Sequence, residues 1–205
     1  RRAPRSRPPA SAGAWTEASL RAPLEAALSS RPRQVVDAPD RAPAAVLVLF
    51  VVRDGEPRMV FSKKTEAVPT HKGQFAFPGG MADTLDASRV ETALREAAEE
   101  IGLDPGDVDV VGLFDDSPTA TSNFVITPVV GVARGTPGFR PDGREIERII
   151  EVPVRELLDP ACYREEWWER GGQRRLVVFF TCGPDLVWGA TGRILRDLLD
   201  AVFPA

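Results

Sequence analysis

Hydrophobic and polar residues alternate with different periods along the chain, and each period predicts a different element. Residues 44–53 form an almost unbroken apolar run, which is typical of a strand buried on both faces. Asp54-Gly55 follows as a tight-turn pair, so residues 59–63 are predicted to return as the partner strand. The same reasoning predicts further strands over residues 108–114, 124–133 and 176–181. Pro128 indicates an edge or bulge position for the strand 124–133.

Three segments repeat their apolar residues every three or four positions, which is the period of an α-helix. The first covers residues 16–29. The second lies between a capping box, formed by Ser88 with Glu91, and Gly102, a residue suited to end a helix. The third begins at residues 188–191 and carries an apolar face.

Composition narrows the class of protein. With 205 residues and 43% hydrophobic content, the chain is predicted to form one globular domain. A net charge of −4 argues against nonspecific nucleic-acid binding, and no apolar run is long enough to span a membrane. Cys162 and Cys182 provide no disulfide framework, so we expect reduced thiols in a cytoplasmic protein. Residues 1–13 are rich in Arg and Pro and lack acids, which predicts a flexible tail.

The second predicted helix carries three acids, Glu96, Glu99 and Glu100, near its C-terminal end. Spacings of three and four place them on one face, opposite the apolar stripe, where like charges repel each other and the helix dipole disfavours anions. A bound divalent cation would offset this repulsion, because carboxylate oxygens suit Mg²⁺ or Mn²⁺. A solvated acidic face is the alternative, and the three carboxylates alone do not decide between them.

The residues around these acids resemble the Nudix box, a glycine followed by Glu and then Arg-Glu-x-x-Glu-Glu-x-Gly. The matching residues are Gly80, Arg95, Glu96, Glu99, Glu100 and Gly102. Asp86 stands in place of the first Glu, and one extra residue separates it from Arg95. The branch of the family that cleaves coenzyme A shares the longer spacing and often the Asp.

A second resemblance, upstream of the box, points to the same branch. Coenzyme A pyrophosphatases carry a signature that runs from Leu-Leu-Thr-x-Arg-Ser through a second Arg to His-x-Gly-Gln and Phe-Pro-Gly-Gly. The matching residues here are His71, Gly73, Gln74, Phe77, Pro78, Gly79 and Gly80. Lys64 replaces the first Arg and Pro69 the second, and a lysine lacks the bidentate geometry with which Arg binds phosphate. The segment Trp188-Gly189-Ala190-Thr191 also resembles this branch.

The resemblance implies an α/β fold, the Nudix α/β/α sandwich with a mixed β-sheet between helices. The residue pattern predicts an N-terminal helix and connector over residues 14–43, and the Nudix domain is expected over residues 44–205. Nudix proteins are often dimers, so a homodimer is one expected state.

The resemblance also implies roles for individual residues. Mg²⁺, with Mn²⁺ as a substitute, would be held by the Gly79 carbonyl and the carboxylates of Glu96, Glu99 and Glu100. Arg95 would orient these carboxylates, and loop residues Asp83 and Asp86 would hold waters around the metal. The general base is left open between Glu99, Glu100 and Glu145. A basic cluster gathers Lys63, Lys64, Lys72 and His71, and Lys64, His71, Lys72 and Gln74 are predicted to bind substrate. A solvated basic loop is the alternative. His71 is the only histidine, so no Ser/His/Asp or Cys/His arrangement is expected.

The expected activity is Mg²⁺-dependent cleavage of coenzyme A or an acyl-CoA into 3′,5′-ADP and a 4′-phosphopantetheine product. Two alternatives remain open. The first is a Nudix diphosphatase for ADP-ribose, NADH or another nucleoside diphosphate derivative. The second is a Nudix-fold ligand sensor without catalysis. Trp167-Trp168 could stack on an adenine, although packing at the edge of the fold is the simpler interpretation.

Overall fold

The computed structural model describes residues 14–65, 74–120 and 122–204. Its helices are α1 Glu17–Ser29, α2 Arg89–Ile101, α3 Val154–Leu157 and α4 Gly189–Val202, with 3-10 turns at Pro105–Asp107 and Pro160–Cys162. Its strands are β1 Ala42–Arg53, β2 Glu56–Lys64, β3 Phe75–Ala76, β4 Gly79–Met81, β5 Val108–Leu113, β6 Ser117–Pro118, β7 Phe124–Ala133, β8 Ile146–Pro153, β9 Tyr163–Arg170, β10 Gln173–Cys182 and β11 Asp185–Trp188. The predicted tail, residues 1–13, and the predicted substrate contacts His71 and Lys72 lie outside the described residues.

The strands form one mixed sheet in the order β5-β7-β1-β2-β3-β11-β10-β9. β1 pairs parallel with β7 and antiparallel with β2. Near its N-terminal end β1 also pairs with β4, and β8 pairs with β2. The turn Asp54-Gly55 joins β1 to β2 with positive φ angles of 52° and 75°, in agreement with the predicted hairpin.

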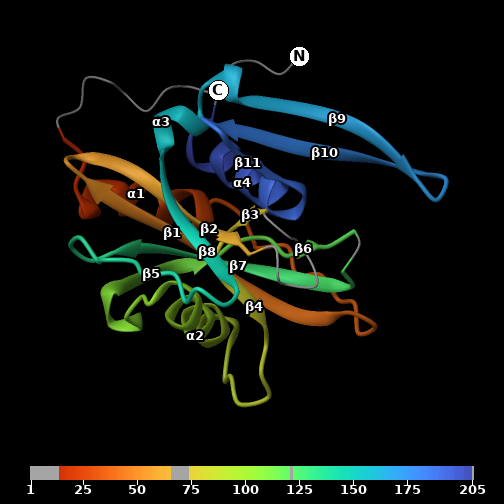
Figure 1. Cartoon of the computed structure of the whole chain (residues 1–205), viewed down its shortest axis with the longest axis horizontal. Coiled ribbons are helices and arrows are strands. Elements are labelled where there is room, and N and C mark those ends of the chain that lie inside the picture. Colours follow the sequence, from red (N-terminus) through yellow and green to blue (C-terminus); the bar gives the residue numbers. More distant parts are fainter. Residues whose placement is uncertain (1–13, 66–73, 121, 205) are drawn as a thin grey trace.

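Helices cover both faces of the sheet (Figure 1), with α2 on one side and α1 and α4 on the other. Residues of β1 alternate between the two sides. Val48 and Phe50 pack in the core that contains residues of α1 and α4, whereas Leu47 and Leu49 pack in the core that contains residues of α2. Because both faces of β1 are buried, its sequence reads as a continuous apolar run. The predicted α/β/α sandwich with a mixed sheet is confirmed.

Pro128 was predicted to lie at an edge or at a bulge, and the edge position is wrong. β7 lies between β1 and β5, and Pro128 pairs with Val46 of β1. On the other side of β7 the partner changes at this point, from β5 at Val129 to β6 at Ile126. The Pro128 carbonyl accepts a hydrogen bond from the Phe114 N–H at 2.9 Å, between the two partner strands. The missing N–H of proline therefore coincides with a break in pairing inside the sheet.

The sequence also did not predict a strand over residues 163–170. In the structure these residues form β9, which pairs antiparallel with β10 as a long hairpin that projects from the sandwich (Figure 1). Charged residues and the exposed Trp167 and Trp168 interrupt any simple alternation of apolar and polar side chains in β9. Partner pairing, which single-sequence periodicity does not detect, decides the conformation here.

Candidate active site

Helix α2 is fixed at both ends by the residues that the sequence indicated. The Ser88 side chain accepts a hydrogen bond from the Glu91 N–H at 3.2 Å. The reciprocal half of the predicted capping box differs, because the Glu91 carboxylate accepts from the Ala87 N–H, at 2.7 Å, instead of from Ser88. At the other end Gly102 takes a left-handed φ of 66° and donates to the Ala98 carbonyl. The two caps therefore set the ends of α2, and the acids in its last turns lie beside Gly79 and Gly80.

The two glycines before the helix allow it to approach the sheet closely. Gly79 has a φ of 153°, and a Cβ there would lie 2.3 Å from the Ala45 carbonyl oxygen. At Gly80 a Cβ would lie 2.4 Å from the Glu96 Oε2 atom. The Glu96 carboxylate thus rests directly on the Gly80 backbone, and this contact leaves no room for a side chain.

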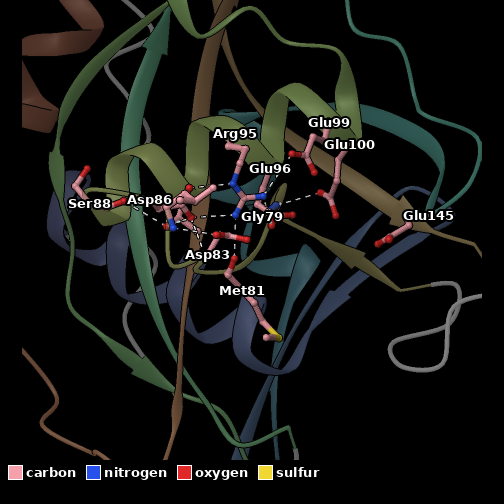
Figure 2. A network of polar contacts seen from close by, with 12 residues as sticks. Gly79, Met81, Asp83, Asp86, Ser88, Arg95, Glu96, Glu99, Glu100 and Glu145 are labelled. Atoms are coloured by element: carbon pink, nitrogen blue, oxygen red, sulfur yellow. Dashed lines mark hydrogen bonds and ion pairs between the residues drawn. The ribbon is translucent and has the colours of Figure 1, made fainter.

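Arg95 lies at the centre of the polar network (Figure 2). Its Nε and Nη2 atoms donate to the two carboxylate oxygens of Asp86, both at 3.0 Å, and Nη2 also donates to the Met81 carbonyl at 3.1 Å. Its Nη1 donates to Glu96 at 2.8 Å and to Glu99 at 3.5 Å. The predicted orienting role of Arg95 agrees with these contacts, since one guanidinium joins the loop to two acids of the helix.

Asp86 accepts hydrogen bonds from protein groups on both carboxylate oxygens, and its expected role in holding waters stays a prediction. One of its oxygens accepts hydrogen bonds from the Asp83 N–H at 2.9 Å and from the Thr92 hydroxyl at 2.8 Å, in addition to its contact with Arg95. The Arg95 guanidinium holds the pKa of Asp86 well below its usual range, with the backbone hydrogen bond from Asp83 as a second cause. Asp86 therefore anchors Arg95 to the loop, and the extra residue between the two does not prevent their contact.

Glu100 is the most deeply buried of the three acids. Its Oε1 atom lies 3.2 Å from the Lys64 Nζ, and its Oε2 atom accepts a hydrogen bond from the Gly79 N–H at 3.1 Å. Lys64 is the last residue of β2, where a bulge shifts the register with β8. The same ammonium lies 3.9 Å from Glu145 Oε2, so it bridges a predicted metal ligand and a candidate base. The sequence placed Lys64 among substrate contacts and did not predict this ion pair.

Glu145 is held near this pair by Asp142, a residue that the sequence analysis did not single out. The Asp142 Oδ1 atom accepts hydrogen bonds from three successive backbone N–H groups, of Arg144, Glu145 and Ile146, at 2.8–3.1 Å. The Asp142 N–H donates to the Glu100 carbonyl at 3.1 Å, which ties the loop to the last turn of α2. In sequence Asp142 stands in a Gly/Pro-rich loop, where nothing distinguishes it from an ordinary turn residue.

The three acids, which the spacing places on one face of the helix, differ in their exposure. Their side chains are 18%, 63% and 6% exposed for Glu96, Glu99 and Glu100 respectively. Glu99 is the most exposed and contacts Arg95 at 3.5 Å, whereas Gly80 lies against Glu96, and Gly79 and Lys64 contact Glu100. Burial raises the pKa of Glu96 and of Glu100; Glu99 raises the pKa of Glu96 further, and Glu96 that of Glu100.

The donor set suits a hard divalent cation. Across residues 14–65, 74–120 and 122–204, no three acidic, His or Cys side chains already converge on one point. The two partly buried carboxylates, Glu96 and Glu100, nevertheless carry charge that burial and mutual repulsion disfavour, and a cation would relieve both effects. Glu99 lies one turn from Glu96 on the same helix, and Arg95 contacts both carboxylates. The residues present thus fit the metal that the box implies.

The predicted substrate contacts are only partly described. Gln74 lies beside Lys64, because its carbonyl accepts a hydrogen bond from the Lys64 N–H at 3.1 Å. The Lys64 side chain points at Glu100, and His71 and Lys72 lie outside the described part of the chain. A substrate-binding role for all four stays a prediction.

Comparison with known proteins decides the family. The family model described as "NUDIX domain" matches residues 41–180. The chain belongs to the Nudix family. Two curated relatives, from Enterobacter sp. (strain 638) and Cronobacter sakazakii, are 34% and 36% identical, and each match covers 82% of this chain and 86% of the relative. Both are named Nudix hydrolase NudL and described as uncharacterized. The chain is therefore a Nudix hydrolase, as the box predicted.

Solved structures agree with the Nudix fold. A Nudix hydrolase from Alicyclobacillus acidocaldarius superimposes with a TM-score of 0.50 at 18% identity, over 80% of this chain and 94% of that one. A MutT/nudix family protein from Enterococcus faecalis gives a TM-score of 0.52 at 12% identity, over 87% of this chain and 72% of that one.

Among the residues that the structure describes, none of the helices is both long enough and apolar enough to cross a membrane.

Proposed function

We propose that this Nudix hydrolase splits the diphosphate of coenzyme A or an acyl-CoA into 3′,5′-ADP and (acyl-)4′-phosphopantetheine, with Mg²⁺ and alternatively Mn²⁺ as cofactor. The observation that supports hydrolysis is the close contact of Glu96 and Glu100 with the Gly79-Gly80 backbone of β4. Arg95 and Lys64 balance the charges of these two acids. The choice of coenzyme A as the substrate is supported by the signature over residues 71–80 and by Asp86 with its longer spacing to Arg95.

In this proposal Glu96, Glu99, Glu100 and the Gly79 carbonyl hold the metal. When bound, the metal neutralises the diphosphate and lowers the pKa of a coordinated water. Arg95, clamped by Asp86, holds Glu96 at 2.8 Å and also contacts Glu99 at 3.5 Å, so one guanidinium orients both carboxylates. Fixed ligands lose less conformational entropy on binding the ion than free ones would.

Among the three candidates we propose Glu145 as the general base. Glu100 is held by Lys64 and by the Gly79 N–H, and Glu99 shares the helix face and the Arg95 contact of Glu96. Glu145 stands on a separate loop, with an exposed side chain beside the Lys64 ammonium. A carboxylate placed there can take a proton from the attacking water without giving up a ligand position.

Substrate recognition is assigned to the side of the site next to β2 and β3. Lys64 and Gln74, together with His71 and Lys72, would contact the phosphates and the pantetheine arm. We also propose that the protein is cytoplasmic and forms a homodimer.

Hydrolysis of ADP-ribose or NADH is the second candidate function, because Pro69 leaves one position of the coenzyme A signature without its positive charge. A sensor would have no need to keep three mutually repelling acids on α2.

The test compares three diphosphates under one set of conditions. Purified protein is incubated with Mg²⁺ and, in parallel, coenzyme A, ADP-ribose or NADH, and products are separated by chromatography. We expect 3′,5′-ADP from coenzyme A as the fastest reaction. Much faster cleavage of ADP-ribose would reject the substrate assignment, and binding without turnover of any of the three would favour the sensor. Glu100→Gln, which preserves shape, should lower turnover by orders of magnitude.

A further inference from the structure

The Lys64 ammonium lies among the acids of the proposed active site. Its Nζ atom is 3.2 Å from Glu100 Oε1 and 3.9 Å from Glu145 Oε2. Burial raises the pKa of Glu96 and of Glu100, and the Lys64 charge opposes this rise at both carboxylates. One side-chain cation therefore provides to these acids the same kind of neutralisation that a divalent ion would provide.

The backbone on either side of Lys64 is held by hydrogen bonds, so only its side chain has to move if the ammonium leaves the acids. The Lys64 N–H donates to the Gln74 carbonyl at 3.1 Å, and the Thr65 N–H donates to the Glu145 carbonyl at 2.8 Å. The Lys64 side chain is 21% exposed, and its four-carbon stem is flexible. The ammonium can therefore move toward solvent while β2 keeps its place in the sheet.

An ammonium and a divalent ion repel each other if both stay on Glu100. At a separation of about 4 Å this repulsion amounts to about 30-fold in an equilibrium constant even in water, and it is far larger beside a buried carboxylate. Release of the ammonium gives up one charged hydrogen bond, which corresponds to about 10- to 100-fold. Release is therefore favoured over joint binding of the two cations.

We infer that Lys64 is an exchangeable counter-ion: its ammonium neutralises Glu100 and Glu145 until a divalent cation binds, and then leaves them. The inference rests on the proposed function for the metal site. It also joins the ion pair in the structure to the predicted substrate contact of Lys64, because the side chain would make the two contacts in turn. Arg, which the coenzyme A signature has at this position, would hold a carboxylate through two parallel N–H groups and exchange less readily.

Affinity for Mg²⁺, measured by calorimetry on protein freed of metal with a chelator, is the first test. Lys64→Met has no ion pair to give up and should bind Mg²⁺ about 10- to 100-fold more tightly than wild type. Lys64→Arg keeps the charge and should bind no more tightly than wild type. The matched control is Lys63→Met, which removes a neighbouring charge that pairs with Glu147 and should change the affinity by less than about 3-fold. Circular dichroism confirms that each variant is folded.

The reactivity of the lysine amines tests release in the wild-type protein itself. The chain has three lysines, so brief acetylation with acetic anhydride, read by tandem mass spectrometry, resolves each of them. Addition of Mg²⁺ should raise the acetylation rate of Lys64 several-fold, because an ion-paired ammonium is shielded from the reagent. Lys63 is the internal reference and should not change. NaCl at the same ionic strength replaces Mg²⁺ in the control.

The outcomes separate this inference from the proposed function. If Mg²⁺ supports cleavage of coenzyme A but leaves Lys64 acetylation unchanged, the inference is rejected and the function stands. The same holds if Lys64→Met binds Mg²⁺ no more tightly than Lys63→Met. If Mg²⁺ releases Lys64 but coenzyme A is not cleaved, the function fails and the exchange stands. A wild type that binds no Mg²⁺ rejects the inference together with the metal site.

Discussion

The ion pair between Lys64 and Glu100 predicts that substitutions at these two positions change the free energy of unfolding non-additively. Lys64→Met keeps most of the side-chain volume but leaves the Glu100 carboxylate, 6% exposed, without its counter-ion. Breaking a buried pair on one side costs about 3–5 kcal/mol. Lys64 is 21% exposed and the Gly79 N–H still contacts Glu100, so we expect about 2–3 kcal/mol at pH 8. Lys64→Met/Glu100→Gln should be more stable than Lys64→Met, because no buried charge remains.

The assay is urea unfolding of metal-free protein for the two single variants and the double variant. Lys63→Met is the matched control, since the neighbouring Lys63 pairs with Glu147 at the same distance of 3.2 Å in a more exposed setting. That variant should lose less than about 1 kcal/mol. If the effects of Lys64→Met and Glu100→Gln add to within about 0.5 kcal/mol, the two groups are not coupled and the reasoning fails.

Three further predictions concern the residues that hold the site together. Gly80→Ala should lower turnover by about 100-fold with little change in substrate binding, because the new Cβ displaces Glu96; unchanged kcat would contradict this. The pKa of Asp86 is lowered in the folded state, so its contribution to stability is present above the unfolded pKa of about 3.9 and is lost as pH falls toward the folded value. Asp86→Asn should therefore flatten the acid limb of a stability–pH curve, and an unchanged limb would refute the clamp. Asp142→Ala should lower kcat by about 10-fold through Glu145, whereas Asp142→Asn, which keeps the Oδ1 acceptor, should stay near wild type; equal losses would exclude the hydrogen-bond explanation.

The regular elements around the site follow from local chemistry that the sequence displays. The apolar run of β1, the Asp54-Gly55 turn and the caps of α2 at Ser88 and Gly102 each depend on residues within a few positions of one another. Local propensities of this kind survive folding when they agree with the tertiary environment. The Nudix box likewise is a local motif, so its spacing already indicated the acidic helix and the role of Arg95.

Contacts between distant segments were decided only by the tertiary structure. Pro128 indicated an edge or a bulge, and the change of partner from β5 to β6 allows it inside the sheet. Charge-rich β9 is a strand because β10 pairs with it. The burial of Glu100 by Lys64, 36 positions away in sequence, had no signal in helical spacing.

The sequence by itself therefore determined the family, the acidic helix and the residue types available for chemistry. The fold decided which charges are paired and which are buried. The physical reason is that helix periodicity and capping act over a few residues, whereas desolvation, ion pairing and strand register depend on segments that only folding brings together.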